Sequence, residues 1–435
     1  MKSNNPALMQ QSAARGVSRV ASRGGFYGWW VVFAGFAALM LASGLGNQSG
    51  GLYMVVLQDE FGWTKAAISG VFALGAVQAA VLAPLQGRLI DRFGPRAIVS
   101  AGFLIMGAGL IGVSTINSIA AFTVYGLMIG LGVTLALDVA PHTAVVNWFK
   151  RKRAAAIGLM MTGLGAGGAL VPVFALSMTG FGWRRAILLG GIAVMVVGTA
   201  AAQLLRRSPE ECGLQPDGES SDATEEGCAG AEVMKEFTVC ETLRTPSFWF
   251  LAFYHAMFSF GVTAVAMHLV PYAVENLDVS LTIAGSLMTL LTVCMVVGYI
   301  FGGFVGDRVH KRKLMIVLTT AQVGALALVV FGGTPPFVIV FAILQGLIVG
   351  ARAPLNFSLR AEYFGRKSYG TIWGISLAIV NIGNMAGIMA TGFLADYFGR
   401  YKEAFILILI LTGVSILLLA LAKRPKVSAR AVADG

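Results

Sequence analysis

The chain has 435 residues, of which 57% are hydrophobic and only 12% are charged, whereas soluble proteins carry about 25% charged residues. This composition excludes an ordinary soluble domain and leaves room for about a dozen membrane spans of ~20 residues each. The net charge of +11 does not indicate nucleic-acid binding, because the basic residues lie in short gaps between apolar segments, as they do in membrane proteins. The expected surroundings are therefore a lipid bilayer, and no nucleic-acid partner is expected.

Twelve apolar segments along the chain predict twelve helical membrane spans. The segments are continuous, whereas the strands of a membrane barrel would alternate apolar and polar residues. Each segment is close to the length that a tilted helix needs to cross a bilayer. The expected spans cover residues 26–48, 65–88, 96–114, 118–143, 154–176, 183–205, 247–271, 282–304, 313–332, 336–361, 369–394 and 401–422.

Polar segments divide these spans into two halves. The first 24 residues are polar and basic, which predicts a tail (1–24) rather than a cleavable signal peptide. Residues 206–246 break the apolar pattern with Ser, Pro, Gly and acidic residues, which predicts a loosely ordered linker. The expected organisation is thus a six-helix bundle over 25–205, the linker, a second bundle over 247–422, and a tail over 423–435.

Basic residues gather in alternate gaps, and this asymmetry predicts the orientation of the spans. Arg92 and Arg96 follow the second span, and the run Lys150–Arg153 follows the fourth. The gaps on the other side hold acidic residues such as Asp59 and Glu60. Because basic loops remain on the cytoplasmic side, we expect both termini and the linker there. We expect the protein to lie in the cell membrane, specifically the inner membrane of a bacterium.

The two halves repeat each other at an offset of 216 residues. The segment Gly87–Arg92 closes one apolar run as Gly-Arg-Leu-Ile-Asp-Arg, and Gly303–Arg308 closes another as Gly-Phe-Val-Gly-Asp-Arg. The same offset relates Gly130 to Gly346, Gly158 to Gly374, Gly167 to Gly383 and Arg184 to Arg400. Duplicated halves in an apolar chain are typical of secondary transporters. The predicted fold is an all-α membrane protein with twelve transmembrane helices in two pseudo-symmetric six-helix bundles.

The motif Gly87-x-Leu89-x-Asp91-Arg92-x-Gly94-x-Arg96 resembles the loop motif of the major facilitator superfamily. The resemblance covers nearly the whole chain, because the spans, the linker and the partial copy of the motif also agree with it. It implies a transporter in which the loop acid holds one state of an alternating-access cycle; the alternative is a simple turn that anchors positive charge. We expect the chain to function as a monomer. The gating residues that it implies are Gly87, Asp91, Arg92, Gly94, Arg96, Asp307 and Arg308.

Three further segments resemble the monocarboxylate and oxalate/formate branch of that superfamily. They are Tyr27-Gly28-Trp29-Trp30 at the first span, Trp148-Phe149 before the basic run, and Gly182-Trp183-Arg184 at the sixth span. Members of this branch often carry a cationic residue in span 8 or span 11. This chain has none in either span, and span 11 offers Asn381 and Asn384 instead.

Arg352 is the one arginine placed well inside a predicted span, and charges inside a bilayer are costly. Asn356 and Arg360 follow at i+4 and i+8 on the same helix face. A guanidinium group there can hold a carboxylate with two parallel hydrogen bonds. We therefore expect Arg352 to bind a small organic anion. The alternative is a structural arginine that pairs with helix carbonyls or with an acid.

Asp138 is the only carboxylate deep in a predicted span, with Thr134 and His142 on its face at i−4 and i+4. A carboxyl group or an imidazole in a span can exchange a proton. Asp138 and His142 are therefore candidates for proton coupling; alternatively, Asp138 neutralises Arg352. The repeat aligns Arg352 with Ala136 or Leu137, which leaves open whether Asp138 and Arg352 both face the cavity.

Four uncharged or weakly basic side chains complete the predicted substrate site. They could bind the substrate or simply join helices to one another. With Arg352 and Asn356, the candidates are Gln78, His255, Asn381 and Asn384.

The sequence has no phosphate-binding loop, metal-ligand cluster or nucleophile motif. The match of Gly163-x-Gly165-x-x-Gly168 to a dinucleotide fingerprint is spurious, because it lies in a span with no strand before it. We expect no cofactor, no metal and no enzymatic activity.

The favoured function is secondary transport of a small organic anion, a monocarboxylate, driven by a proton gradient or by exchange for a counter-anion. The alternatives are a drug or amphiphile exporter of the same fold and a membrane solute sensor.

Overall fold

The computed structural model describes residues 26–218, 236–277, 279–332 and 334–425, and its regular elements are helices. Twelve stretches of these residues are long and apolar enough to cross a membrane. The predicted fold class is thus confirmed. The predicted tail 1–24, the middle of the predicted linker (219–235) and most of the predicted C-terminal tail (426–435) lie outside the described residues.

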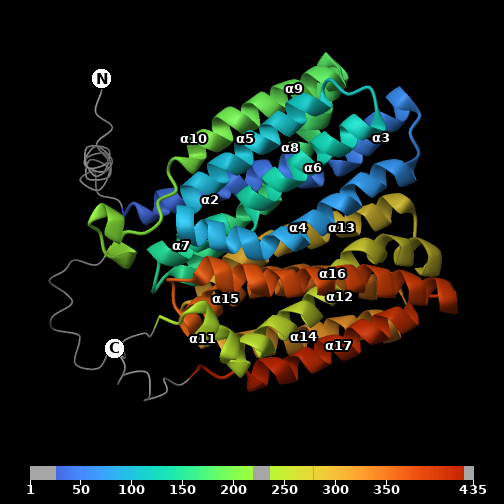
Figure 1. The fold of residues 1–435 in the computed structure, drawn as a ribbon. Coiled ribbons are helices and arrows are strands. Elements are labelled where there is room, and N and C mark those ends of the chain that lie inside the picture. The colour runs from blue at the N-terminus through green and yellow to red at the C-terminus, as the bar shows by residue number, and fades with distance from the viewer. Residues whose placement is uncertain (1–25, 219–235, 278, 333, 426–435) are drawn as a thin grey trace, which may run out of the picture. The chain divides into compact units, whose positions relative to one another are not determined.

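The first six spans are built from eleven elements (Figure 1). They are α2 (Gly28–Leu41), η1 (Ala42–Gln48), α3 (Gly50–Phe61), α4 (Lys65–Phe93), α5 (Pro95–Val113), α6 (Ile119–Leu137), α7 (Ala140–Trp148), α8 (Arg153–Phe181), α9 (Trp183–Ala193), η2 (Val194–Gly198) and α10 (Thr199–Ala202).

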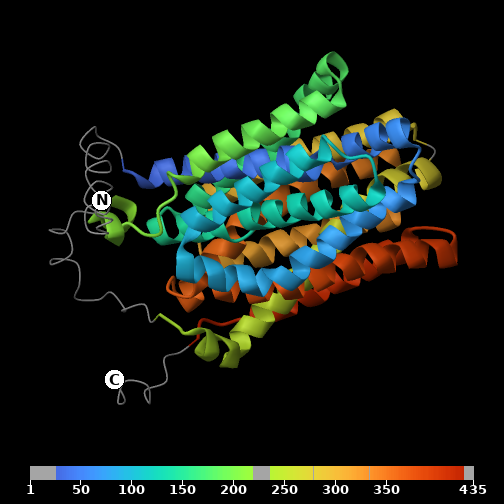
Figure 2. The same ribbon diagram turned by 45° about the horizontal axis from the view of Figure 1, so that its top comes forward.

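The described parts of the linker contain three short helices, and each of the last six spans is one continuous helix. They are η3 (Glu210–Cys212), η4 (Pro216–Gly218), α11 (Val239–Arg244), α12 (Pro246–Leu277), α13 (Leu281–Gly306), α14 (Lys311–Gly332), α15 (Pro335–Phe364), α16 (Tyr369–Phe398) and α17 (Lys402–Leu421). The same helices can be followed by colour in the turned view of Figure 2.

The first span is longer than its apolar run predicts. It extends from Gly28 to Phe61, so Asp59 and Glu60, which were predicted in a gap, lie in the last turn of α3. The helix ends at Gly62, whose φ of 66° is in the left-handed region. A glycine there is a common helix stop. Hydropathy had marked the end of the apolar run, but this glycine sets the end of the helix.

The fourth predicted span is interrupted, which corrects the expectation of one continuous helix face through Thr134, Asp138 and His142. Helix α6 ends at Leu137, Asp138 and Val139 lie between the helices, and α7 begins at Ala140. Pro141 explains the break, because it has no N–H to donate to the carbonyl four residues earlier, at Leu137.

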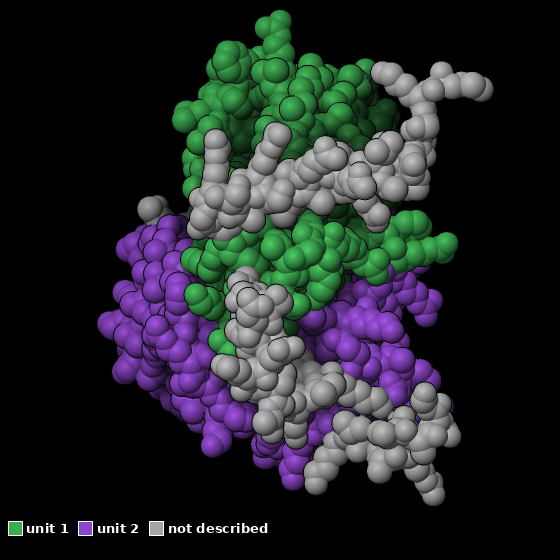
Figure 3. Space-filling view, turned by 90° about the vertical axis from the view of Figure 1, so that its left-hand side faces the viewer, with its two compact units in different colours: residues 1–75, 92–234 green, residues 76–91, 235–435 purple. Residues whose placement is uncertain are grey.

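The chain forms two compact units (Figure 3). Unit 1 comprises residues 1–75 and 92–234, and unit 2 comprises residues 76–91 and 235–435. In unit 1, α5 packs on α6 and α2 packs on α8. In unit 2, α13 packs on α15, α12 on α16 and α14 on α17. The greater part of α4, residues 76–91, has its contacts in unit 2.

Small residues allow the closest helix contacts in both units. A Cβ atom on Gly302 of α13 would overlap the backbone of Ala351 in α15. Gly163 and Gly167, which lie within the spurious dinucleotide match, have the same role in unit 1, where a Cβ would meet backbone carbonyl groups of Phe36 and Met40. Gly-rich spans therefore pack here by close backbone approach, as is common in membranes.

Candidate functional site

Arg352 lies near the middle of α15 and is buried, with 4% of its surface exposed. Its guanidinium carbon is 3.2 Å from the ring centroid of Phe258 and 5.0 Å from that of Tyr254, both on α12. Its Nε and Nη1 are buried and have no hydrogen-bond partner within the described residues. The aromatic rings cover the face of the guanidinium group, so further partners of these nitrogens must lie in its plane.

Arg360, two helical turns further along α15, has a very different environment. It is 1% exposed. Its Nη2 donates to the carbonyl of Leu251 at 3.0 Å and to Oγ of Ser376 at 3.1 Å, and its Nη1 donates to Oδ1 of Asn356. The group also lies 5.0 Å from the ring centroid of Trp373. Arg360 therefore joins α12, α15 and α16, and is a structural arginine.

Asn356 links Arg360 to His255 of α12. Because a guanidinium group only donates hydrogen bonds, the oxygen of the Asn356 side chain faces Arg360 and its NH₂ group faces His255. The Asn356 nitrogen is 3.2 Å from Nδ1 and 3.4 Å from Nε2 of His255. The His255 ring stacks on Trp373 with centroids 5.7 Å apart. The structure thus brings two predicted substrate-binding residues, Asn356 and His255, into contact, and Arg352 lies about one helical turn before Asn356 on α15.

The other predicted polar residues lie elsewhere. Oδ1 of Asn384 accepts a hydrogen bond from Ser259, and its Nδ2 lies 3.5 Å from Oδ1 of Asn381. The carbonyl of Asn384 also accepts from Thr263 at 3.3 Å. These contacts join α16 to α12, as the helix-joining alternative expects. Gln78 of α4 is half-buried, and its Oε1 has no hydrogen-bond partner in the described chain.

Asp138 and His142 lie in unit 1 at the break between α6 and α7. His142 is 4% exposed, and its Nδ1 is 2.8 Å from the backbone carbonyl of Asp138. The hydroxyl of Thr134 donates to the carbonyl of Gly130. The bond from His142 therefore goes to the Asp138 main chain, and Nδ1 carries the proton because a carbonyl can only accept.

Asp91 holds the beginning of α16. Its carboxylate accepts hydrogen bonds from the backbone N–H groups of Gly370, at 3.1 Å, and Thr371, at 2.8 Å, and from the Thr371 hydroxyl at 2.6 Å. The first N–H groups of a helix have no partner within the helix, and its N-terminus attracts negative charge. Asp91 satisfies both requirements.

The glycine residues at this contact allow α4 and α16 to approach closely. A Cβ on Gly87 would overlap the carbonyl of Gly370, and a Cβ on Gly374 would overlap that of Ala83. Gly87 is thus needed for Asp91 to reach the first turn of α16. Sequence reasoning did not identify Thr371 as the partner, although a Ser-Tyr-Gly-Thr start of an apolar segment is a recognisable helix beginning.

The remaining motif residues lie at the turn into α5 and at the end of α13. Gly94 has a φ of 81°, in the left-handed region, and Pro95 follows as the first residue of α5. Arg96 donates from Nε to Gln203 at 2.8 Å, and the Arg92 guanidinium lies 5.3 Å from the Phe93 ring centroid. In the partial copy, Asp307 and Arg308 directly follow α13.

The sequence profile of the Major Facilitator Superfamily matches residues 34–269 and again 251–434, and the chain belongs to this family of membrane transporters. Among named relatives, monocarboxylate transporter 13 of Rattus norvegicus is 26% identical over 396 residues, which cover 90% of this chain and 87% of the relative. Monocarboxylate transporter 11 of Mus musculus is 28% identical over 401 residues, which cover 88% and 84%. The resemblance to the monocarboxylate branch is confirmed.

Solved structures show the same fold. A crystal structure of the E. coli fucose:proton symporter FucP matches with a TM-score of 0.67 at 16% identity, over 90% of this chain and 98% of that chain.

The two buried arginines should differ in their effect on stability. Arg360→Met should lower the free energy of unfolding by about 3 kcal/mol, because it leaves buried acceptors on three helices without donors. Arg352→Met should change it by less than about 1 kcal/mol or raise it, since it removes buried nitrogens that lack partners. Thermal unfolding of both purified variants in one detergent at one scan rate measures this. Equal midpoints would contradict the distinction.

Proposed function

We propose that the chain moves a small organic anion, a monocarboxylate, across the membrane by alternating access, and that Arg352 binds its carboxylate. The observation that carries the proposal is the buried Arg352 guanidinium with two nitrogens lacking partners in the described chain. The relatives named as monocarboxylate transporters support the same substrate class.

The energetics of burial support an anionic partner for Arg352. Removing an ion from water costs several kcal/mol even after relaxation. Cation–π contacts such as those with Phe258 and Tyr254 return about 2 kcal/mol when desolvated. The rings thus offset only part of the cost, and a carboxylate in the guanidinium plane would supply the remainder. Arg360 has no such need, because protein groups already occupy its nitrogens.

The test is uptake by purified protein in vesicles, with radiolabelled acetate, propionate, lactate and pyruvate. Arg352→Ala should abolish saturable uptake, and Arg352→Lys should reduce it more than about tenfold, because lysine keeps the charge but loses the planar fork. Thr320→Ala is the control and should leave uptake unchanged, since the exposed Thr320 hydroxyl donates to the carbonyl of Ile316 within its own helix. Saturable uptake by correctly inserted Arg352→Ala with unchanged half-saturation would remove Arg352 from the site and favour an amphiphile exporter.

We further propose that the coupling ion is a proton carried by Asp138 and His142. Both lie where the fourth span is interrupted and backbone groups leave the regular helix pattern. Interrupted helices in transporters commonly lie at ion sites. Exchange for a second anion, without net proton movement, is the competing form of energy coupling.

The coupling proposal predicts a separation of two activities. Asp138→Asn should remove the stimulation of uptake by an inward pH gradient, because the amide cannot carry a proton. It should leave exchange of internal for external substrate within about twofold of the parent, since exchange needs no net proton transfer. The measurement is uptake with and without the gradient, in empty and in substrate-loaded vesicles. Full gradient stimulation in Asp138→Asn would exclude this carboxylate as the carrier.

Asp91 is proposed to act as the gate, in an orientation where its end of α4 faces the cytoplasm. Its three hydrogen bonds to Gly370 and Thr371 support a role in stabilising one conformational state. The basic residues in the same loops support the orientation. The proposed mechanism is that breaking these bonds lets α4 and α16 separate in one step of the cycle.

Asp91→Asn should slow maximal transport about fivefold and leave half-saturation unchanged. The amide keeps an acceptor but loses the charge, and charge-assisted hydrogen bonds are roughly twice as strong as neutral ones. Asp59→Asn, which neutralises an exposed carboxylate of α3, should transport at the parental rate. Initial rates over a range of substrate concentrations measure both quantities, and a parental maximal rate for Asp91→Asn would rule out the gate.

A further inference from the structure

The segment that leads into α11 places a second carboxylate at the turn before α16. One oxygen of Glu236, Oε2, accepts the backbone N–H groups of Arg366 at 2.8 Å and Lys367 at 2.7 Å. These N–H groups lie between the end of α15 and the beginning of α16. Neither sequence motifs nor the proposed gate account for this carboxylate.

Glu236 is held in place by its neighbours. The N–H of Phe237 donates to the carbonyl of Phe364 at 3.1 Å, and the two rings make an edge contact with centroids 6.4 Å apart. Thr238 and Glu241 then form a reciprocal capping box that begins α11. The backbone next to Glu236 is thus fixed on the last residue of α15, and the exposed Glu236 side chain reaches the turn from that anchored position.

The turn is shaped around this carboxylate. Gly365 has a φ of 84°, in the left-handed region, and ends α15. A Cβ at this position would lie 2.7 Å from Oε2 of Glu236, closer than van der Waals contact allows. Position 365 therefore favours glycine for two reasons, which are its left-handed backbone conformation and the close approach of the Glu236 carboxylate.

Glu236 and Asp91 hold opposite ends of the same short segment. Glu236 binds the N–H groups of Arg366 and Lys367, and Asp91 binds those of Gly370 and Thr371. Only two residues lie between the two pairs. The direction in which the second pair points depends on the conformation of the first pair, because each residue has only two freely rotating backbone bonds.

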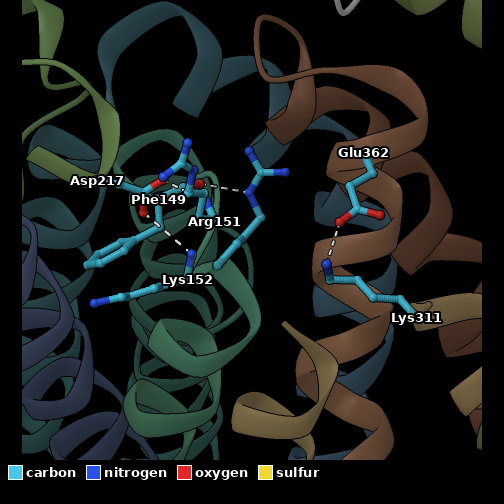
Figure 4. A network of polar contacts seen from close by, with 7 residues as sticks. Phe149, Arg151, Lys152, Asp217, Lys311 and Glu362 are labelled. Carbon is cyan, nitrogen blue, oxygen red and sulfur yellow. Dashed lines mark hydrogen bonds and ion pairs between the residues drawn. The ribbon is translucent and has the colours of Figure 1, made fainter. Parts of the chain in front are cut away.

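Unit 1 contains a similar contact, in which a linker carboxylate binds successive backbone N–H groups just before a span. The carboxylate of Asp217 accepts the N–H groups of Lys150 at 2.9 Å, Arg151 at 2.6 Å and Lys152 at 3.4 Å (Figure 4). The repeat offset of 216 makes Lys150 and Arg151 the counterparts of Arg366 and Lys367. Asp217 has a φ of 60°, which is unusual for a non-glycine residue. A linker carboxylate therefore holds the turn before α8 as well as the turn before α16.

We propose that Glu236 is a positioning residue for the gate, and that it fixes residues 365–371 so that the N–H groups of Gly370 and Thr371 face Asp91. The inference rests on the gating role proposed for Asp91. Through Glu236, the conformation of residues 236–238, which lead into α11, sets the strength of the gate. Asp217 has the equivalent effect on the turn before α8.

Hydrogen–deuterium exchange with residue-level fragmentation tests the positioning directly, in lipid nanodiscs and without substrate. Glu236→Ala should raise exchange about tenfold at Gly370 and Thr371 as well as at Arg366 and Lys367. Glu236→Gln, which keeps an acceptor oxygen, should restore most of the protection. Asp217→Asn is the matched control, and it should leave Gly370 and Thr371 unchanged. Faster exchange at Arg366 and Lys367 alone would overturn the proposal.

A transport measurement separates positioning from an independent structural effect. Glu236→Ala should lower maximal transport with unchanged half-saturation, and combining it with Asp91→Asn should slow transport no further than Asp91→Asn alone. Additive slowing would show that the residues act separately and would also overturn the proposal. If Glu236→Ala does not insert, Glu236→Asp, which keeps the charge on a shorter side chain, provides the same comparisons. The exchange result can be interpreted even if the transported substrate is different.

Discussion

The absence of water from the bilayer interior is the constraint on which the whole structure depends. Every backbone polar group in a span must find its partner within the chain, and this restricts the spans to helices or a closed barrel; the continuous apolar runs of this chain form helices. The same constraint applies to charged side chains. Arg360 meets it with acceptors from three helices, whereas Arg352 has aromatic rings on its face and two nitrogens without partners in the described chain. This contrast between two arginines on one helix face marks Arg360 as a structural residue and Arg352 as a candidate substrate-binding residue.

The N-termini of helices also contain backbone polar groups that need partners. Their first N–H groups have no partner within the helix, and in this protein carboxylates from distant parts of the chain provide it. Asp91 of α4, Glu236 before α11 and Asp217 in η4 each bind successive N–H groups at or just before the start of a span. Bonds of this kind are strong enough to hold a state and few enough to break in one step. They are therefore well suited to transporter gating.

Proline and glycine residues account for the places where the observed helix ends differ from the ends predicted from hydropathy. The apolar runs located the spans, because hydropathy over about 20 residues is a property of local sequence. The ends differed where a single residue controlled the backbone, as at Gly62 after α3 and at Pro141 in the interrupted fourth span. Asn356 contacts His255 of α12, whereas Asn384 bonds to Asn381 in its own helix and to Ser259 of α12.

The sequence by itself determined the twelve spans, the duplicated halves and the family, since composition, hydropathy and motif spacing are readable along the chain. It also singled out Asp91 and Arg352. Only the tertiary structure decided what these residues contact. Thr371 is 280 residues from Asp91 along the chain, and Leu251 is 109 residues from Arg360. A hydrogen bond depends on where two distant backbones lie to within a few tenths of an ångström, and no local pattern in the sequence encodes that position.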